Sequence, residues 1–310
     1  FKQKTAYEIS LGLVGSEMCI RDRSRLSVPQ IACIALSLAV FGCSGGNSRS
    51  NSTIQVGGSD TMVNVAQKWA EVYTSENPDI SVQVSGGGSG VGIAGLMDGE
   101  LAMANASRAI KDEEQELVKK NLGQDPVEHV VGRDALAVYV HKDNPLNKIS
   151  LAQLAAIYGE SGDITKWSQL GIKVEGDDEI VRVSRQNSSG TYVYFRETVL
   201  GKKGNYKQGA INQSGSKDVV DLVSTTASAI GYSGMGYATD QVKMLAISKA
   251  DDDAVEPTAE NAASGKYPIA RPLLIYTIGQ PSGSLKIYLD WILSSKGQKI
   301  VSDLGYVPIN

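Results

Sequence analysis

The sequence predicts an α/β protein, and two observations lead to this fold class. Short segments of apolar and β-branched residues, such as residues 53–58 and 80–88, alternate along the chain with segments whose apolar residues recur at helical spacing. Met62, Val65 and Trp69 show this second pattern directly after the first strand. Because strands that alternate with helices usually pair in parallel, we expect mostly parallel sheets. The 310 residues allow one large or two medium domains.

Each predicted element is bounded by residues that start or stop it. Ser59, Asp60 and Thr61 are candidate N-caps for the first helix, and Pro145 ends the longest strand pattern. The last segment is amphipathic. In chain order the predicted elements are strand 53–58, helix 59–78, strand 80–88, helix 90–100, strand 101–107, helix 110–121, strand 127–145, helix 150–160, strand, turn and helix 180–200, helix and strand 216–234, strand 270–279 and a long helix with a terminal tail at 282–309.

Composition excludes several classes of function. The net charge is −4, so there is no basic surface of the kind that binds nucleic acid. All three cysteines lie in the first 43 residues, so the rest of the chain has no disulfide, cysteine nucleophile or cysteine metal site. His129 and His141 are too few and too isolated for a histidine metal cluster. We therefore expect no metal, no cofactor and no membrane span in the body of the protein.

The N-terminal region is expected to direct export rather than to fold. Arg25 precedes an apolar run that ends at Cys43, and residues 43–53 are a tether rich in Gly, Ser and Asn. Residues 24–42 resemble a bacterial lipoprotein signal peptide, which predicts lipidation of Cys43 and a periplasmic or cell-surface location. The alternative is a plain cleaved signal with an incidental cysteine. Residues 1–23 contain "MCIRDR", which resembles a translated sequencing adapter, and we interpret them as an assembly artefact.

Four polar turns share one pattern. The turns at residues 58–61, 86–90, 105–108 and 185–191 each follow a strand, supply Ser, Thr or Gly, and precede a helix. Unpaired N–H groups at a helix N-terminus attract anions, and loops at the carboxyl ends of strands are where α/β proteins bind ligands. Plain helix capping is the better explanation of any one turn taken singly, but four such turns favour a shared oxyanion site. The candidate hydroxyl donors are Ser59, Thr61, Ser89, Ser107, Ser189 and Thr191, and Arg185 is a candidate bidentate ligand.

Ordered motifs over residues 54–310 resemble one known family. They include "GGSDTM", "SGGGSGVGIAGLMDGELAMANASR", "VGRDALAVYVHKDNP", "VSRQNSSGTYVYF" and "LDWILSSKGQKIVSDLGYVPI". These motifs are similar to the phosphate-binding proteins of bacterial phosphate ABC transporters. The resemblance implies a two-domain periplasmic-binding-protein fold of type II (Venus flytrap), with two crossover hinge strands. We assign residues 54–135 and 247–310 to domain I and residues 136–246 to domain II.

The resemblance also implies the function and the partners. It predicts a monomer that binds inorganic phosphate outside the cytoplasmic membrane and delivers it to the transmembrane subunits of an ABC permease. The membrane contact would be made only through the lipid anchor. Matching the family's ligands position by position gives Thr61 and Met62 in the first turn, Ser89 in the second, and Arg185, Ser189, Gly190 and Thr191 in the fourth. Gly90 and Ser107 complete the candidate site from their own turns.

Two positions depart from the family pattern. Some members have an aspartate that accepts the phosphate's proton where this chain has Arg108, and another aspartate where it has Asn187. Arg108 is therefore either a second phosphate ligand or a surface charge. Because a site that prefers phosphate to sulfate needs a proton acceptor, we propose Asp60, the acidic residue of the four turns, with helix capping as the alternative.

Rival functions have weaker support in the sequence. "GGGSGVG" is not followed by the Gly-Lys-Ser/Thr of a nucleotide-binding loop. The serine nucleophile motif Gly-x-Ser-x-Gly fails by one residue around Ser89, so we expect no enzyme activity. The remaining alternatives are another oxyanion on the same fold (sulfate, molybdate or phosphonate), a phosphatase or other hydrolase, and a surface sensor or adhesion module.

Overall fold

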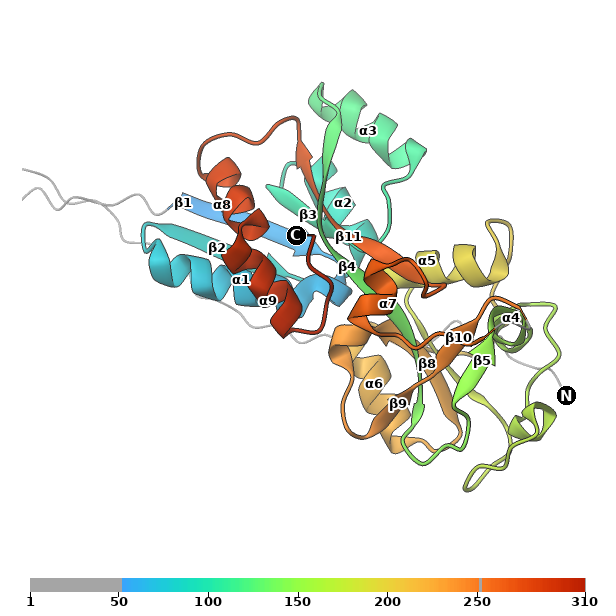
Figure 1. The fold of residues 1–310 in the computed structure, drawn as a ribbon. Coiled ribbons are helices and arrows are strands. Elements are labelled where there is room, and N and C mark those ends of the chain that lie inside the picture. Colours follow the sequence, from blue (N-terminus) through green and yellow to red (C-terminus); the bar gives the residue numbers. More distant parts are fainter. Residues whose placement is uncertain (1–51, 251–252, 310) are drawn as a thin grey trace, which may run out of the picture. The chain divides into compact units, whose positions relative to one another are not determined.

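The computed structural model describes residues 52–250 and 253–309 (Figure 1). The segments predicted at residues 1–23 and 24–42, the lipidation site Cys43 and nearly all of the tether lie outside these residues. None of the helices in the described part of the chain has the length and apolar character needed to cross a membrane.

One half of the described fold is built on a first sheet with the order β2-β1-β3-β11-β4. The parallel strands are β1 (Ser52–Gly58), β2 (Ile80–Ser85) and β3 (Met103–Ala106), and β11 (Ala270–Ile278) runs antiparallel to both β3 and β4 (Pro126–His141). Helices cover both faces of this sheet. They are α1 (Val63–Glu76), α8 (Gly283–Leu293) and α9 (Ser295–Asp303) on one face, and α2 (Ser89–Met97) and α3 (Asp112–Leu122) on the other.

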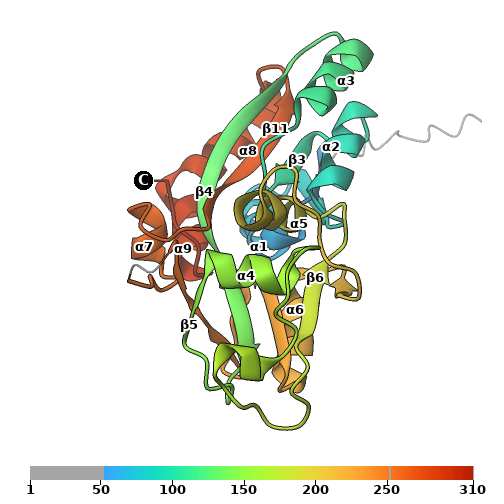
Figure 2. The same ribbon diagram turned by 90° about the vertical axis from the view of Figure 1, so that its right-hand side faces the viewer.

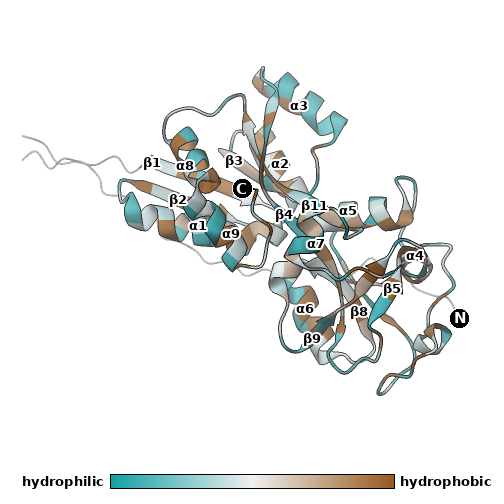
Figure 3. Cartoon of the chain, viewed as in Figure 1, coloured by the Kyte–Doolittle hydropathy of each residue, from teal (hydrophilic) through white to brown (hydrophobic). Residues whose placement is uncertain are grey.

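The two faces have separate cores because side chains alternate along a strand. Ile54 and Val56 of β1 pack with Trp69 of α1 in one core, while Ala104 and Leu96 belong to the other. Helix α3 contributes little to either, since Val118 is its buried residue and the rest of its surface is largely hydrophilic (Figure 3).

The second half is built on the far part of β4. There β4 pairs with β8 (Ala229–Gly234) and β9 (Val242–Met244), and β6 (Val181–Arg185) lies parallel to β8 and to β7 (Ile211–Gln213). The other elements are α4 (Leu151–Tyr158), α5 (Gly190–Phe195), a π-helical turn (Arg196–Leu200), α6 (Ser216–Thr225), α7 (Ala259–Ala263), the parallel pair β5 (Lys148–Ser150) and β10 (Ala246–Ser248), and 3-10 turns at Asp60–Met62, Trp167–Leu170 and Met235–Tyr237.

Strand β4 belongs to both sheets, which Figure 2 shows along its length. Residues up to Ala135 pair with β11, and residues from Leu136 pair with β8. The chain therefore crosses between the sheets once along β4 and returns before β11. Ile247 and Ile269, which lie on the returning segment, pack in the core of the second half. The predicted domain boundaries themselves remain a prediction.

The predicted long C-terminal helix differs from the structure, which has two helices there. Ser294 is extended and its hydroxyl caps α9 by accepting from the N–H of Gly297. A Cβ at Gly297 would lie 2.2 Å from the carbonyl oxygen of Ile292, so the second helix packs too closely on the first for any larger residue. The sequence pattern is amphipathic through this break because both helices bury the same face.

Candidate functional site

Buried hydroxyl groups from both sheets gather between the loops that follow β1, β2, β3 and β6. Each residue is at most 1% exposed. They are the hydroxyl residues named from the sequence: Ser59, Thr61, Ser89, Ser107, Ser189 and Thr191. Water is thus excluded from a cluster of groups that normally bond to water, and each must find another partner.

The hydroxyl groups bond to one another across the sheets. Thr61 Oγ1 lies 2.8 Å from Thr191 Oγ1, although the two residues are 130 positions apart in the chain. Ser59 Oγ donates to Ser107 Oγ at 2.9 Å, and the N–H of Ser107 donates to Ser89 Oγ at 3.0 Å. The structure therefore brings five of the predicted hydroxyl residues into two bonded groups, a threonine pair and a serine trio.

Gly190 allows this close approach. A Cβ at this position would lie 2.2 Å from Ser89 Oγ and 2.8 Å from Ser107 Oγ. The start of α5 is therefore pressed against hydroxyls from the first sheet. The sixth hydroxyl, that of Ser189, caps α5 by accepting from the N–H of Tyr192 at 3.4 Å.

A buried ion pair that we did not predict lies against the hydroxyls. Arg271 Nη2 donates to Thr61 Oγ1 at 3.2 Å and to Thr191 Oγ1 at 3.0 Å, and Nη1 donates to the carbonyl of Ser107 at 3.1 Å. The same Nη2 is 2.8 Å from Asp134 Oδ2, and both side chains are fully buried. Burial raises the pKa of Asp134, and the Arg271 charge opposes this rise. The sequence signal was a charge inside each of two strongly apolar strands.

The predicted ligand Arg185 is held by groups from both sheets. Its Nη1 donates to Ser216 Oγ at 2.9 Å, and its Nη2 donates to the Ser214 carbonyl at 2.7 Å and to Asp60 Oδ2 at 2.9 Å. Burial lowers the pKa of Arg185, while the Asp60 charge opposes this shift. Its Nε is buried without a hydrogen-bond partner among the described residues, so it remains able to donate.

Asp60 does not cap its own helix, which was the alternative to its predicted role. Its Oδ1 accepts from the N–H of Gly87 at 2.9 Å, and its Oδ2 accepts from Arg185. Both oxygens are therefore engaged outside the 3-10 turn to which Asp60 belongs.

Arg108 points to α3 instead of the hydroxyl groups. Its guanidinium makes two bonds to Glu114, at 2.7 and 2.6 Å, and one to the carbonyl of Ala109 at 2.9 Å. The pair lowers the pKa of Glu114, although burial acts in the opposite direction and is the largest single influence. Arg108 is 7% exposed, so the structure places it in a buried ion pair with α3, neither among the hydroxyl groups nor as the surface charge that was the alternative.

The other two predicted residues are positioned through their main chain. The side chain of Met62 is buried in the first core, and its N–H donates to the Ser59 carbonyl at 2.9 Å. The N–H of Gly90 donates to the Ser188 carbonyl of the opposite half at 2.9 Å.

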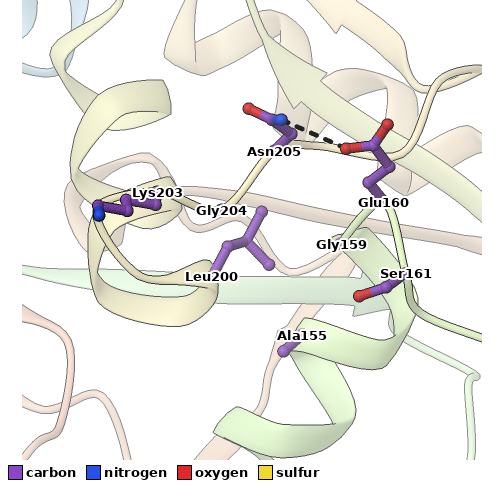
Figure 4. Close-up of a pocket in the computed structure, with 8 residues that line it drawn as sticks. All are labelled: Ala155, Gly159, Glu160, Ser161, Leu200, Lys203, Gly204 and Asn205. Carbon is purple, nitrogen blue, oxygen red and sulfur yellow. Dashed lines mark hydrogen bonds between the residues drawn. The ribbon is translucent and has the colours of Figure 1, made fainter.

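A separate surface pocket lies in the second half, between the end of α4 and the π-helical turn (Figure 4). Its volume is about 390 Å³, and Asn205 Nδ2 donates to Glu160 Oε2 at 3.3 Å on its wall. The lining contains no residue predicted for the oxyanion site. The pocket is therefore separate from the hydroxyl cluster.

Comparison with known proteins gives the class first. A family model described as a PBP superfamily domain matches residues 45–296. A phosphate-binding protein PstS of Pseudomonas aeruginosa is 36% identical over 264 residues, covering 81% of both chains, and one of Bacillus subtilis is 34% identical over 265 residues, covering 85% of this chain and 83% of the relative. The chain therefore belongs to the PBP superfamily and, within it, to the PstS-type phosphate-binding proteins.

Solved structures agree with this assignment. A Clostridium perfringens structure with bound phosphate, described as a phosphate ABC transporter substrate-binding protein, has a TM-score of 0.74 and 31% identity, covering 84% of this chain and 100% of that chain. An ABC-type phosphate transport receptor from Vibrio cholerae has a TM-score of 0.64 and 28% identity, covering 82% of this chain and 99% of that one. The predicted α/β periplasmic-binding-protein fold is confirmed.

Proposed function

We propose that this chain binds inorganic phosphate outside the cytoplasmic membrane and delivers it to an ABC permease. One observation supports this most strongly: buried hydroxyls from both sheets converge on a single place beside the Arg271 guanidinium. Names of the relatives point to the same ligand. The proposed ligands are the six hydroxyl residues, the main chains of Met62, Gly90 and Gly190, and the two arginines, Arg185 and Arg271.

Binding exchanges one set of hydrogen bonds for another. A phosphate between Thr61 and Thr191 would accept from both hydroxyls and from Arg271, replacing the bond that joins the two threonines. The hydroxyls lose little because each keeps one partner, and charge-assisted bonds are stronger than neutral ones. A micromolar dissociation constant requires only about 8 kcal/mol, which several such bonds supply even after desolvation costs.

The fixed charges of the site cancel. Arg185 is paired with Asp60 and Arg271 with Asp134, so these four side chains have no net charge. The net charge of the occupied site would therefore be that of the phosphate itself. That charge is then held by hydroxyl and amide dipoles in a buried site, where such bonds are strong. No long-range positive field is needed, in agreement with the net charge of −4.

Selection against sulfate needs an acceptor for the proton that phosphate carries. We propose Asp134 for this role because it is fully buried and shares Arg271 with Thr61 and Thr191. Asp60, proposed from the sequence, accepts N–H groups at both oxygens, and so does Asp134. Burial separates the two, because the Asp60 side chain is 14% exposed and that of Asp134 is fully buried. A buried acceptor rejects an anion without a proton because the two oxygens then face each other without a hydrogen.

The remaining parts of the proposal concern location, catalysis and domain motion. We propose a lipid anchor at Cys43, no enzyme activity and a monomer. His129 bonds to Thr277 and His141 lies beside Asp143, so in the described residues neither is placed as a base for a serine of the cluster. We also propose that the return crossing lies nearer residue 270 than residue 247, because Ile269 packs in the second core.

Titration calorimetry on the purified protein, stripped of bound ligand, tests the function. We expect one phosphate per chain at micromolar or lower dissociation constant and at least hundredfold weaker binding of sulfate at pH 7 to 8. Equal affinity for both anions, or tighter binding of molybdate or a phosphonate, would assign the site to another oxyanion. Hydrolysis of a chromogenic phosphate ester would contradict the absence of enzyme activity.

A further inference from the structure

We infer that Asp60 is a positioning residue that links closure of the two halves to Arg185, and that it acts on how long a bound oxyanion stays rather than on which oxyanion binds. The inference rests on the proposed function, because Arg185 is a proposed phosphate ligand. Asp60 follows β1 of the first sheet and Arg185 ends β6 of the second, so the ion pair of 2.9 Å joins the two halves.

Each partner is already oriented by its own half. The N–H of Gly87 fixes Asp60 from the first half, and the Ser214 carbonyl and Ser216 hydroxyl fix Arg185 from the second. Neither side chain needs to search for its rotamer when the halves meet, so little conformational entropy opposes the pair. Opening of the halves would break the bond between Asp60 and Arg185. The three bonds that each lie within one half would remain.

When the two halves are closed, the buried charge of Arg185 needs the Asp60 carboxylate as its partner. The Arg185 side chain is fully buried here, whereas the Asp60 side chain is 14% exposed. A buried guanidinium without a carboxylate is strongly unfavourable, because its lost hydration is not replaced. Asp60 therefore favours the closed arrangement specifically, and removal of its charge shifts the balance towards the open one.

Gly87 and Asp60 also accept further hydrogen bonds from the opposite half through their main-chain carbonyls. The carbonyl of Gly87 accepts from Ser188 Oγ at 3.1 Å and from Gln186 Nε2 at 3.3 Å. The hydroxyl of Tyr237 donates to the main-chain carbonyl of Asp60 at 2.7 Å. Asp60 and Gly87 thus connect the halves through both side-chain and main-chain groups.

Gly86 leaves room for the Asp60 carboxylate. A Cβ at Gly86 would lie 2.7 Å from Asp60 Oδ1, closer than real Cβ contacts allow. Replacement of Gly86 by alanine should therefore displace the carboxylate without changing any charge. This gives a second, independent way to weaken the pair.

The test measures phosphate dissociation by stopped flow and affinity by calorimetry for the purified protein and three variants. For Asp60→Asn we expect dissociation at least tenfold faster, association within about threefold, and a phosphate-to-sulfate affinity ratio unchanged within about twofold. Gly86→Ala should give the same pattern with a smaller change. Glu71→Gln, which removes one acidic charge from an exposed ion pair on α1, is the control and should change none of these values.

The outcomes are distinguishable. If Asp60→Asn collapses the phosphate-to-sulfate ratio, Asp60 is the proton acceptor and the inference is overturned. If dissociation is unchanged in both Asp60→Asn and Gly86→Ala, the pair does not hold the closed form. Failure of the proposed function itself would appear separately, as absence of phosphate binding in the unmodified protein. Circular dichroism and the unfolding midpoint establish that each variant folds, and Gly86→Ala carries the test if Asp60→Asn does not.

Discussion

Two arginine–aspartate pairs lie at the site, one fully buried and one with a partly exposed carboxylate, and they are built in different ways. Arg271 and Asp134 lie directly opposite each other on neighbouring strands, so strand pairing alone brings them together. Arg185 and Asp60 come from different sheets and meet only where the two halves touch. The first pair is part of the folded sheet whether or not the halves are closed. The second pair forms only when the halves are closed.

The largest expected effect separates folding from closure. Arg271→Met leaves Asp134 buried without its cation, which should lower the free energy of unfolding by about 3–5 kcal/mol even without ligand. It also removes donors to both threonines, so phosphate binding should fall by about a thousandfold or more. Urea unfolding and calorimetry measure the two losses. By contrast, Asp60→Asn should change unfolding by much less, and equal losses in both variants would remove the distinction between the pairs.

The second prediction concerns selectivity at the sheet-bound pair. Asp134→Asn keeps the shape of the side chain but can donate a hydrogen bond as well as accept one. We expect the phosphate-to-sulfate affinity ratio to fall by about a hundredfold, mostly through weaker phosphate binding. Competition calorimetry measures the ratio. An unchanged ratio would place the proton acceptor elsewhere and would make Asp60 the remaining carboxylate.

Asp134 also predicts how stability responds to pH. Because burial raises its pKa in the folded state, the folded protein holds this proton more tightly than the unfolded chain does. Its contribution to stability is therefore greatest at low pH and is lost as pH rises through the raised pKa. The unfolding midpoint of Asp134→Asn should lack this component as pH rises above the usual carboxyl range. Identical pH profiles for both proteins would show that Arg271 fully offsets the burial.

The next prediction concerns the close contact between Gly190 of the second half and Ser89 of the first. Gly190→Ala adds a methyl group that would lie 2.2 Å from Ser89 Oγ, so the hydroxyls of the first sheet must shift. We expect a tenfold to hundredfold loss of phosphate affinity with little change in the unfolding midpoint. Gly201→Ala, in the second half and with no atom within 4 Å of the added methyl, is a control for the substitution itself, although its positive φ will cost some stability. Equal affinities for Gly190→Ala and the unmodified protein would mean that this contact is not tight in solution.

The smallest effect is expected at Arg108, outside both pairs. Because Arg108 bonds to Glu114, Arg108→Gln should leave phosphate affinity within about twofold. The lowered pKa of Glu114 means that its pair stabilises the protein above the usual carboxyl range and loses this contribution as pH falls through the lowered pKa. The variant should therefore lose about 1 kcal/mol near neutral pH and little in acid, measured by urea unfolding. A large loss of phosphate affinity would restore Arg108 as a ligand.

Sequence reasoning reached the site through local signals and missed what depends on distant pairing. Ser59, Thr61, Ser89 and Thr191 were predicted because a polar turn between a strand and a helix is visible within ten residues of sequence. Arg271 and Asp134 were missed because their meeting depends on the pairing of β4 with β11, 137 positions apart. Asp60 and Arg185 were both predicted as site residues, but the ion pair between them was not, for the same reason.

The strand order of the first sheet has a consequence for how the protein is made. β11 lies between β3 and β4, yet it comes near the end of the chain. Until residues 270–278 have been synthesised, β3 and β4 each present an unpaired edge, and Asp134 has no arginine. Exposed strand edges invite pairing with other chains. A nascent or truncated chain that stops before residue 270 is thus prone to aggregation, and this exposure ends only when residues 270–278 pair with both edges.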